Sequence, residues 1–303
     1  MDHGAGGRRI DRRLMGEEKP PYNFLGLPQE FTIYEKAQVA IVPVPFDLTT
    51  SWMAGASQGP KAIIEASGYV ELYDIETRSE AYLRGIFTDG DVQAKDNQEL
   101  NKKVHERVRK HLDASKFVVT LGGEHSISYG AAQAHIERFD NLSILHLDAH
   151  TDRRDEFEDN KFSHACTLRR ISELNDDIVS VGIRSLDKGE LQYLDERKVF
   201  YAEDIFHSMD WSKQVIDLLQ PNVYLTFDLD VFDPAIMPST GTPEPGGMYW
   251  YQVLGLLKDV IAARNLVGCD VVELSPDEQN KAPDFLAAKL IYKILSYKFA
   301  TRA

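Results

Sequence analysis

Carboxylates and imidazoles alternate in two short segments that each follow an apolar run. The first segment is Asp148-Ala149-His150-Thr151-Asp152, and the second is Asp228-Leu229-Asp230. Side chains two residues apart on a strand point to one face, so the acidic groups of each segment can converge. Four aspartates in one small volume would raise each other's pKa, and divalent cations would remove that penalty. The number of ligands predicts a dinuclear metal centre.

A third segment has the same form. The apolar run 117–121 leads into Gly122-Gly123-Glu124-His125-Ser126, where the paired glycines permit a sharp turn. We expect His125 at a strand-to-helix junction, where α/β sheets carry functional groups, and Ser126 as the cap of a helix over 127–139. Three strands therefore deliver candidate ligands to one edge of a sheet.

Apolar strands alternate with amphipathic helices along the chain. The predicted strands are 39–44, 117–121, 142–147, 178–183, 199–201, 223–227 and 267–273, and the further predicted helices are 59–72, 97–112, 249–264 and 284–299. This alternation predicts a three-layer α/β/α fold with a mostly parallel sheet. We expect a single catalytic domain over residues 35–303, preceded by a polar, partly mobile N-terminal arm over 1–34.

Composition excludes several classes of function. The net charge of −14 is a poor match for nucleic acid or an anionic membrane surface. No apolar run reaches eighteen residues, so no membrane span is expected. The two cysteines, Cys166 and Cys269, offer no disulfide framework, which favours a cytoplasmic location.

Six motifs together resemble the ureohydrolase family of arginases and agmatinases. They are GGEHS at 122–126, DAHTD at 148–152, SHAC at 163–166, TFDLDVFDP at 226–234, GTPEPGG at 241–247 and VVELSP at 271–276. They occur in the family's order over about residues 35–300, which chance rarely produces. The resemblance is strongest to agmatinase-type members and implies an arginase-like fold and a homo-oligomer, either a trimer or a hexamer.

The resemblance also implies a ligand set. One metal would lie among His125, Asp148, Asp152 and Asp228, and the other among His150, Asp148, Asp228 and Asp230. Carboxylates outnumber imidazoles and no thiolate takes part, so two Mn²⁺ fit better than Zn²⁺, with Ni²⁺ as an alternative. Two such ions about 3.5–4 Å apart lower the pKa of a shared water, which can then attack a guanidinium carbon.

Further site residues follow from the same resemblance. Asp152 would transfer a proton to the leaving amine, Glu273 would pair with the guanidinium, and His164 would shuttle protons or contact substrate. Thr242 would support Glu273, and Asp187 would assist substrate binding. Ala165-Cys166 follows His164 where many relatives carry Gly-Thr. His146 lies further down its strand, so we expect a core histidine or one that supports a ligand.

The loop after the first acidic motif bears on the substrate. Asp155, Glu156, Glu158 and Asp159 stand where arginases bind the carboxylate of arginine, with Arg154 at their asparagine position. Four acidic groups favour an amine, so the sequence predicts a small cationic guanidine substrate, agmatine, cleaved to putrescine and urea. Alternatives are N1-aminopropylagmatine, free guanidine, arginine, and guanidinobutyrate if Arg153 and Arg154 bind an anion. A non-catalytic metal-binding homologue is a further alternative.

Overall fold

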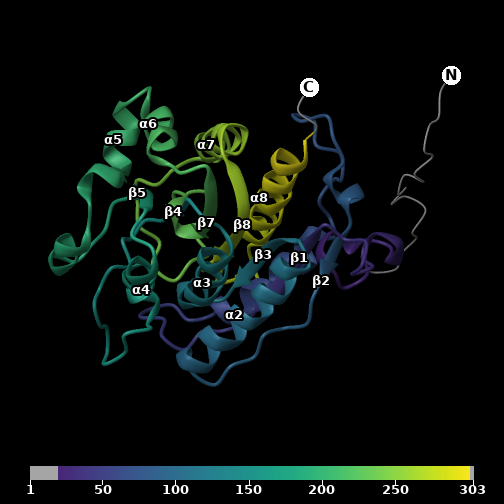
Figure 1. Cartoon of the computed structure of the whole chain (residues 1–303), viewed down its shortest axis with the longest axis horizontal. Coiled ribbons are helices and arrows are strands. Elements are labelled where there is room, and N and C mark those ends of the chain that lie inside the picture. The colour runs from purple at the N-terminus through teal and green to yellow at the C-terminus, as the bar shows by residue number, and fades with distance from the viewer. Residues whose placement is uncertain (1–19, 301–303) are drawn as a thin grey trace.

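The computed structural model describes residues 20–300, which form one parallel sheet between two helical layers (Figure 1). Within that range the sheet has eight strands in the order β2-β1-β3-β8-β7-β4-β5-β6. Their bounds are β1 Val39–Val44, β2 Ile86–Thr88, β3 Phe117–Gly122, β4 Leu142–Leu147, β5 Ile178–Ile183, β6 Val199–Tyr201, β7 Asn222–Asp228 and β8 Asn265–Val272. The predicted three-layer fold is confirmed.

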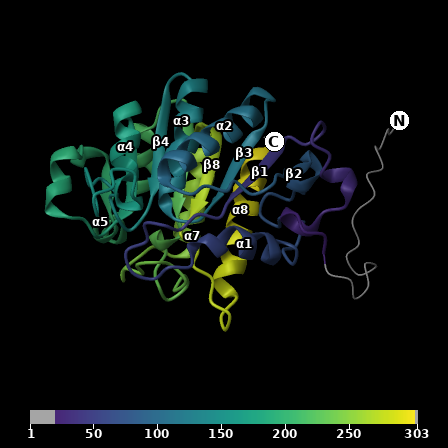
Figure 2. The same cartoon turned by 90° about the horizontal axis from the view of Figure 1, so that it is seen from below.

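Helices cover both faces of the sheet. Figure 2 shows α2 and α3 on one side and α1 and α7 on the other. The helices are α1 Gly59–Ser67, α2 Asn97–Asp113, α3 Ser128–Arg138, α4 Thr167–Leu174, α5 Ala202–His207, α6 Trp211–Leu218, α7 Trp250–Ala263 and α8 Ala282–Phe299. Among the described residues, no helix combines the length and the apolar character needed to cross a membrane.

The core consists of two apolar layers, one on each face of the sheet. In β3, Val119 and Leu121 belong to the layer that also contains residues of α1, α7 and α8, whereas Val118 belongs to the layer with residues of α2 and α3. The six residues of β3 are all buried, because helices exclude water from both faces of a parallel sheet. This double burial fixes the strand ends that carry the predicted site.

Several local features differ from the sequence predictions. The short edge strand β2 and the helices α4, α5 and α6 were not predicted. Ser126 does not cap a helix; its hydroxyl donates to Glu124 Oε1 at 2.6 Å. Of the predicted N-terminal arm, residues 1–19 lie outside the described residues, while Phe24 and Leu25 are fully buried in the core. The domain boundary at residue 35 stays a prediction.

Candidate metal centre and active site

The four central strands β3, β8, β7 and β4 carry the candidate site at their carboxyl ends. His125 follows β3, Glu273 follows β8, Asp228 ends β7, and Asp148 follows β4. The carboxyl ends of parallel strands meet at one edge, where α/β sheets bind their ligands. The strand order therefore brings together segments that are more than a hundred residues apart in the chain.

The same local turn shapes both acidic motifs. Asp148 Oδ1 accepts the N–H of His150 at 2.6 Å, and Asp228 Oδ1 accepts the N–H of Asp230 at 2.8 Å. An aspartate that binds the N–H two residues on forms an Asx turn, so the chain bends at the motif instead of continuing as a strand. In both aspartates the other oxygen, Oδ2, lies near His125. The acidic groups converge through these turns and not through strand alternation.

Two site residues have backbone conformations that L-residues rarely adopt. Asp152 has φ 49° and Glu273 has φ 67°, both in the left-handed region. Such conformations cost roughly 1–3 kcal/mol and persist only where the surrounding structure enforces them. Asp152 ends the motif that follows β4, and Glu273 directly follows β8.

The His125 ring forms the centre of one ligand group. Its Nδ1 lies 3.1 Å from Asp148 Oδ2, 3.0 Å from Asp152 Oδ2 and 3.4 Å from Asp228 Oδ2. These are the four residues predicted to share the first metal. Nδ1 is buried, and within the described residues none of these close contacts has the geometry of a hydrogen bond.

A hydrogen-bond chain fixes the tautomer of this ring. Thr226 Oγ1 donates to Asp270 Oδ1 at 2.8 Å, so it can only accept from His125 Nε2 at 2.9 Å. The proton of a neutral His125 therefore sits on Nε2, and Nδ1 presents a lone pair to the three carboxylates. A ring whose far N–H is held by such a chain is the usual form of a metal-binding histidine.

His150 forms the second group. Its Nδ1 lies 2.9 Å from Asp230 Oδ2 and 3.6 Å from Asp148 Oδ1. Asp148 thus directs one oxygen toward each histidine, which is the arrangement that a bridging carboxylate requires. Asp148, His150 and Asp230 are close enough to share one ion.

The electrostatics of the cluster call for added positive charge. Burial, followed by the charges of Asp230 and Asp148, raises the pKa of Asp228 well above its ordinary range. Burial alone would lower the pKa of His150, but Asp230 and Asp148 raise it to about 12. Protons or cations must balance these carboxylates. The oxygen-rich donor set and the lone pair of His125 Nδ1 fit divalent cations.

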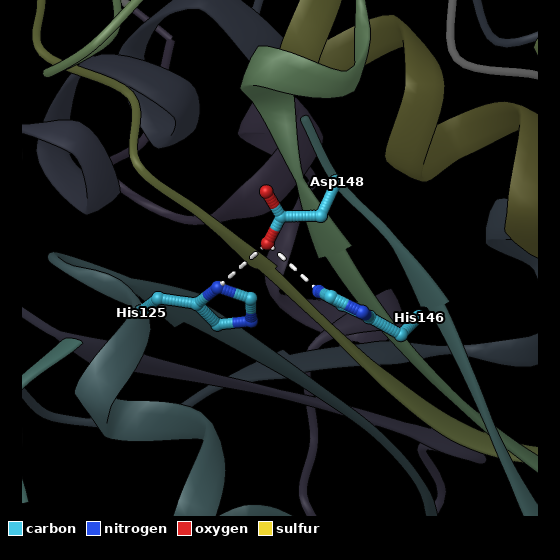
Figure 3. A group of neighbouring side chains, drawn as sticks. All are labelled: His125, His146 and Asp148. Atoms are coloured by element: carbon cyan, nitrogen blue, oxygen red, sulfur yellow. Dashed lines mark hydrogen bonds and ion pairs between the residues drawn. The ribbon is translucent and has the colours of Figure 1, made fainter. Parts of the chain in front are cut away.

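His146 supports Asp148 from the strand side. Its Nε2 lies 2.8 Å from Asp148 Oδ2, and its Nδ1 lies 3.1 Å from Ser180 Oγ. Figure 3 shows the rings of His125 and His146 meeting the same carboxylate oxygen of Asp148. His146 could also complete an ion site with these two residues. We favour a role in which His146 donates a hydrogen bond from Nε2 to Asp148. The Ser180 hydroxyl can donate to Nδ1, which leaves the ring proton on Nε2.

The remaining predicted groups, with the exception of Asp187, line a small cavity of about 20 Å³. It is lined by Thr50, Ser51, His150, Asp152, His164, Asp228, Asp230, Gly241, Thr242 and Glu273. Glu273 Oε1 accepts the N–H of His125 at 2.6 Å. Burial, with the charge of Glu124 next, raises the pKa of Glu273 well above its ordinary range. This buried carboxylate therefore favours a cationic partner.

Glu124 and Thr49 are additional polar groups at the site that the sequence did not indicate. The buried Glu124 accepts the Thr49 N–H and hydroxyl, both at 2.6 Å. Thr49 Oγ1 in turn accepts the N–H of His164 at 3.0 Å and lies 3.3 Å from its Nδ1. Glu124 stands beside His125 in the first motif, but Thr49 gave no signal because its contacts are with distant residues.

The acidic loop and Asp187 lie outside the cavity lining, and some of their charges already have partners. Asp155 lies 2.6 Å from Arg170 Nη2. Asp187 accepts the N–H of Gly189 at 2.8 Å and lies 3.7 Å from Arg154. Arg153 is buried and donates to the carbonyl of Tyr193 at 2.7 Å. Both arginines of the suggested anion-binding pair thus have partners within the protein.

Comparison with known proteins agrees with this architecture. Residues 37–296 match the model of the arginase family. The chain is 34% identical to the N(1)-aminopropylagmatine ureohydrolase of Synechocystis sp., covering 91% of this chain and 96% of that protein. It is 38% identical to an enzyme of that name from Thermus thermophilus, covering 88% and 92%. The solved agmatine ureohydrolase of Thermoplasma volcanium superposes with a TM-score of 0.80 at 32% identity, covering 88% of this chain and 91% of that one. A family match over most of its length, together with relatives that share a third or more of its residues, shows that this chain belongs to the arginase family.

Proposed function

We propose that the chain is a metal-dependent ureohydrolase that cleaves an amine-bearing linear guanidine, with agmatine giving putrescine and urea. One observation carries this proposal: the buried carboxylate of Glu273 faces the same small cavity as Asp152, Asp228 and Asp230. A carboxylate that needs a cation thus stands beside candidate metal ligands. This arrangement suits a substrate with a guanidinium group.

The proposed metal ligands are the two groups described above. His125, Asp148, Asp152 and Asp228 would hold one ion, and His150, Asp148, Asp228 and Asp230 the other. Mn²⁺ suits this carboxylate-rich, thiolate-free set. When bound, two such ions would supply the Lewis acidity that activates a water for attack on the guanidinium carbon.

The chain's own residues would bind the substrate and move protons. Glu273 would pair with the guanidinium and orient its carbon, because its charge is otherwise uncompensated in a buried site. Asp152 borders the cavity and would carry a proton to the departing amine. His164 is oriented by the Thr49 hydroxyl and would exchange that proton with solvent. Thr242 and Asp187 remain predicted substrate-binding residues.

A second substrate has specific support. The two relatives described above are named N(1)-aminopropylagmatine ureohydrolases. That compound is agmatine extended at its amine, so its reacting end and its first cationic nitrogen are unchanged. Guanidinobutyrate is less favoured, because Arg153 and Arg154 are engaged within the protein. A non-catalytic homologue is also less favoured, since Asp152 and Glu273 are both present.

Association and location belong to the same proposal. Large apolar side chains are exposed beside the start of α7, including Tyr251 at 83%, Ile75 at 83% and Phe206 at 78%, and Ile75 and Phe206 each line a hollow together with Tyr251. Exposed groups of this kind mark association surfaces and support a homo-oligomer, a trimer or hexamer by family resemblance. Both cysteines are free and buried, which suits the reducing cytoplasm.

The decisive experiment is a urea-release assay with metal-stripped and Mn²⁺-loaded protein. The substrates are agmatine, N1-aminopropylagmatine, guanidinobutyrate, arginine and free guanidine. We expect metal-dependent urea release with the highest kcat/KM for one of the two amine-bearing, carboxylate-free guanidines. A preference for arginine or guanidinobutyrate would contradict the proposed substrate class. Metal binding without urea release from any of the five would favour the non-catalytic alternative.

A further inference from the structure

Glu244 places a carboxylate at the outer side of His150, beside the candidate metal centre. We propose that this carboxylate binds the cationic nitrogen at the far end of the substrate and so selects amine-bearing guanidines. This inference rests on the proposed function and names the residue that binds the substrate amine. Glu244 lies within the GTPEPGG motif at 241–247, and the sequence alone predicts no role for it.

The distance between the two side chains leaves Glu244 free to bind a ligand. Glu244 Oε1 lies 3.9 Å from His150 Nε2, which is an ion-pair separation and too long for a hydrogen bond. Its side chain is 37% exposed. Among residues 20–300, His150 is the one basic group within 4.0 Å of this carboxylate. Glu244 can therefore accept hydrogen bonds from an incoming ammonium.

The backbone of Glu244 is fixed to the metal-ligand loop. Arg184 Nη2 donates to the Glu244 carbonyl at 2.8 Å and to the Asp230 carbonyl at 2.6 Å. On the other side of the turn, Asp233 Oδ2 accepts the N–H groups of Gly246 and Gly247 at 3.0 and 3.1 Å. One guanidinium thus holds the candidate ligand and the candidate specificity residue in a fixed relation. Such pre-organisation reduces the entropy lost on binding.

Glu244 lies on the side of the His150 ring away from the candidate metal ligands, and the proposed substrate is long enough to reach past that ring. His150 Nδ1 faces Asp230 and Asp148, whereas Nε2 on the opposite side of the ring lies 3.9 Å from Glu244 Oε1. In extended agmatine the amine is six bonds from the guanidinium carbon, a span of about 7 Å by ordinary covalent geometry. The secondary amine of N1-aminopropylagmatine occupies the same place along the chain. The Glu244 carboxylate can therefore bind the cationic nitrogen of both substrates.

The same position predicts discrimination against arginine. The α-carboxylate of arginine is attached to the carbon that carries the amine, so it would approach Glu244 together with the ammonium. Like charges at this separation repel, and a site built for an amine then rejects the acid. Asp155 and Asp187 are weaker candidates for this contact, because each already lies near an arginine of the protein. The acidic loop would add only a diffuse negative field.

The test combines a variant with a truncated substrate. Glu244→Gln keeps the shape of the side chain and removes its charge, and butylguanidine is agmatine without the amine. We expect kcat/KM for agmatine to fall about 10- to 100-fold, mostly through KM, as loss of a hydrogen bond to a charged group predicts. Turnover of butylguanidine should change less than about twofold. Glu203→Gln, which removes another exposed carboxylate, is the matched control and should behave as wild type.

Two measurements distinguish an amine contact from a purely structural role of Glu244. Equal losses for agmatine and butylguanidine, together with weaker Mn²⁺ binding, would show that Glu244 only supports His150 and would overturn the proposal. Calorimetric binding of 1,4-diaminobutane to the Mn²⁺-loaded protein needs no turnover. If the wild-type protein releases no urea, the proposed function fails. The amine contact of Glu244 is then still tested by the expected loss of diaminobutane affinity in Glu244→Gln. Unchanged affinity in that variant would refute the amine contact.

Discussion

The hydroxyl of Thr226 links the His125 ring to the buried carboxylate of Asp270. Thr226→Val keeps the shape of the side chain but removes the acceptor for His125 Nε2 and a donor to Asp270 Oδ1. His125 then has no partner that fixes its proton on Nε2. We expect this one substitution to weaken metal binding and to destabilise the metal-free protein.

The structure gives the magnitude of each effect. A buried polar group that loses its partner costs about 1–3 kcal/mol, and here two groups are affected. Asp270 keeps the Tyr224 hydroxyl at 2.5 Å, so its share is the smaller one. The free energy of unfolding should therefore fall by about 2–4 kcal/mol. Loss of a group that orients a metal ligand typically weakens metal binding about 10- to 100-fold.

Denaturant unfolding of the metal-free protein and calorimetric Mn²⁺ titration measure the two effects separately. Thr120→Val is the matched control, since Thr120 pairs with Asp270 on the neighbouring strand β8. The Thr120 hydroxyl is buried and has no hydrogen-bond partner among the described residues, so its loss should be nearly neutral. A Thr226→Val protein with wild-type Mn²⁺ affinity would refute the tautomer argument, whatever its stability.

Three further predictions follow from the geometry. Asp228→Ala should abolish most Mn²⁺ binding and urea release, because both proposed ions use this carboxylate; two bound ions with normal turnover would contradict the assignment. Asp152→Asn should keep the fold and lower kcat by about a hundredfold or more, since an amide cannot carry the proton; metal content is measured beside it, and an unimpaired variant would exclude the role. Burial lowers the pKa of His135 from 6.5 to about 4. The unfolded state therefore binds more protons between these values, and stability falls by about 3 kcal/mol as the pH drops from 6.5 to 4. Urea unfolding across this pH range should show a shallower loss for His135→Gln, and an equal slope in both proteins would contradict the assignment.

The sequence correctly predicted that the side chains of the two acidic motifs lie close together, but strand alternation is only part of the reason. Strand alternation explained the spacing of Asp148, His150 and Asp152, yet β4 ends at Leu147 and an Asx turn brings the groups together. The prediction of proximity held because apolar runs end where polar ligands begin, and parallel strands end at one edge. Spacing alone could not distinguish a strand from a turn with the same period.

Groups that act through distant partners could not be predicted. Arg184 holds carbonyls that are 46 and 60 residues away, and Glu124 binds Thr49 across 75 residues. A single sequence contains no signal that pairs such positions. Ser126 shows the converse error: a serine before a helix is a typical cap, but a buried carboxylate two residues earlier takes its hydroxyl.

The size of the cavity adds a condition on substrate binding. A space of about 20 Å³ holds about one water, whereas a guanidinium is several times larger. We therefore expect the lining contributed by Thr50, Ser51, Gly241 and Thr242 to move apart when Glu273 pairs with a substrate. Gly241 contributes no side chain to this lining, and even a Cβ there would meet Glu273 Oε2 only at an ordinary contact distance of 3.7 Å. The candidate metal-ligand residues follow buried strands, while Thr50, Ser51, Gly241 and Thr242 lie in loops. We therefore expect the site to open toward a substrate without disturbing the candidate ligands.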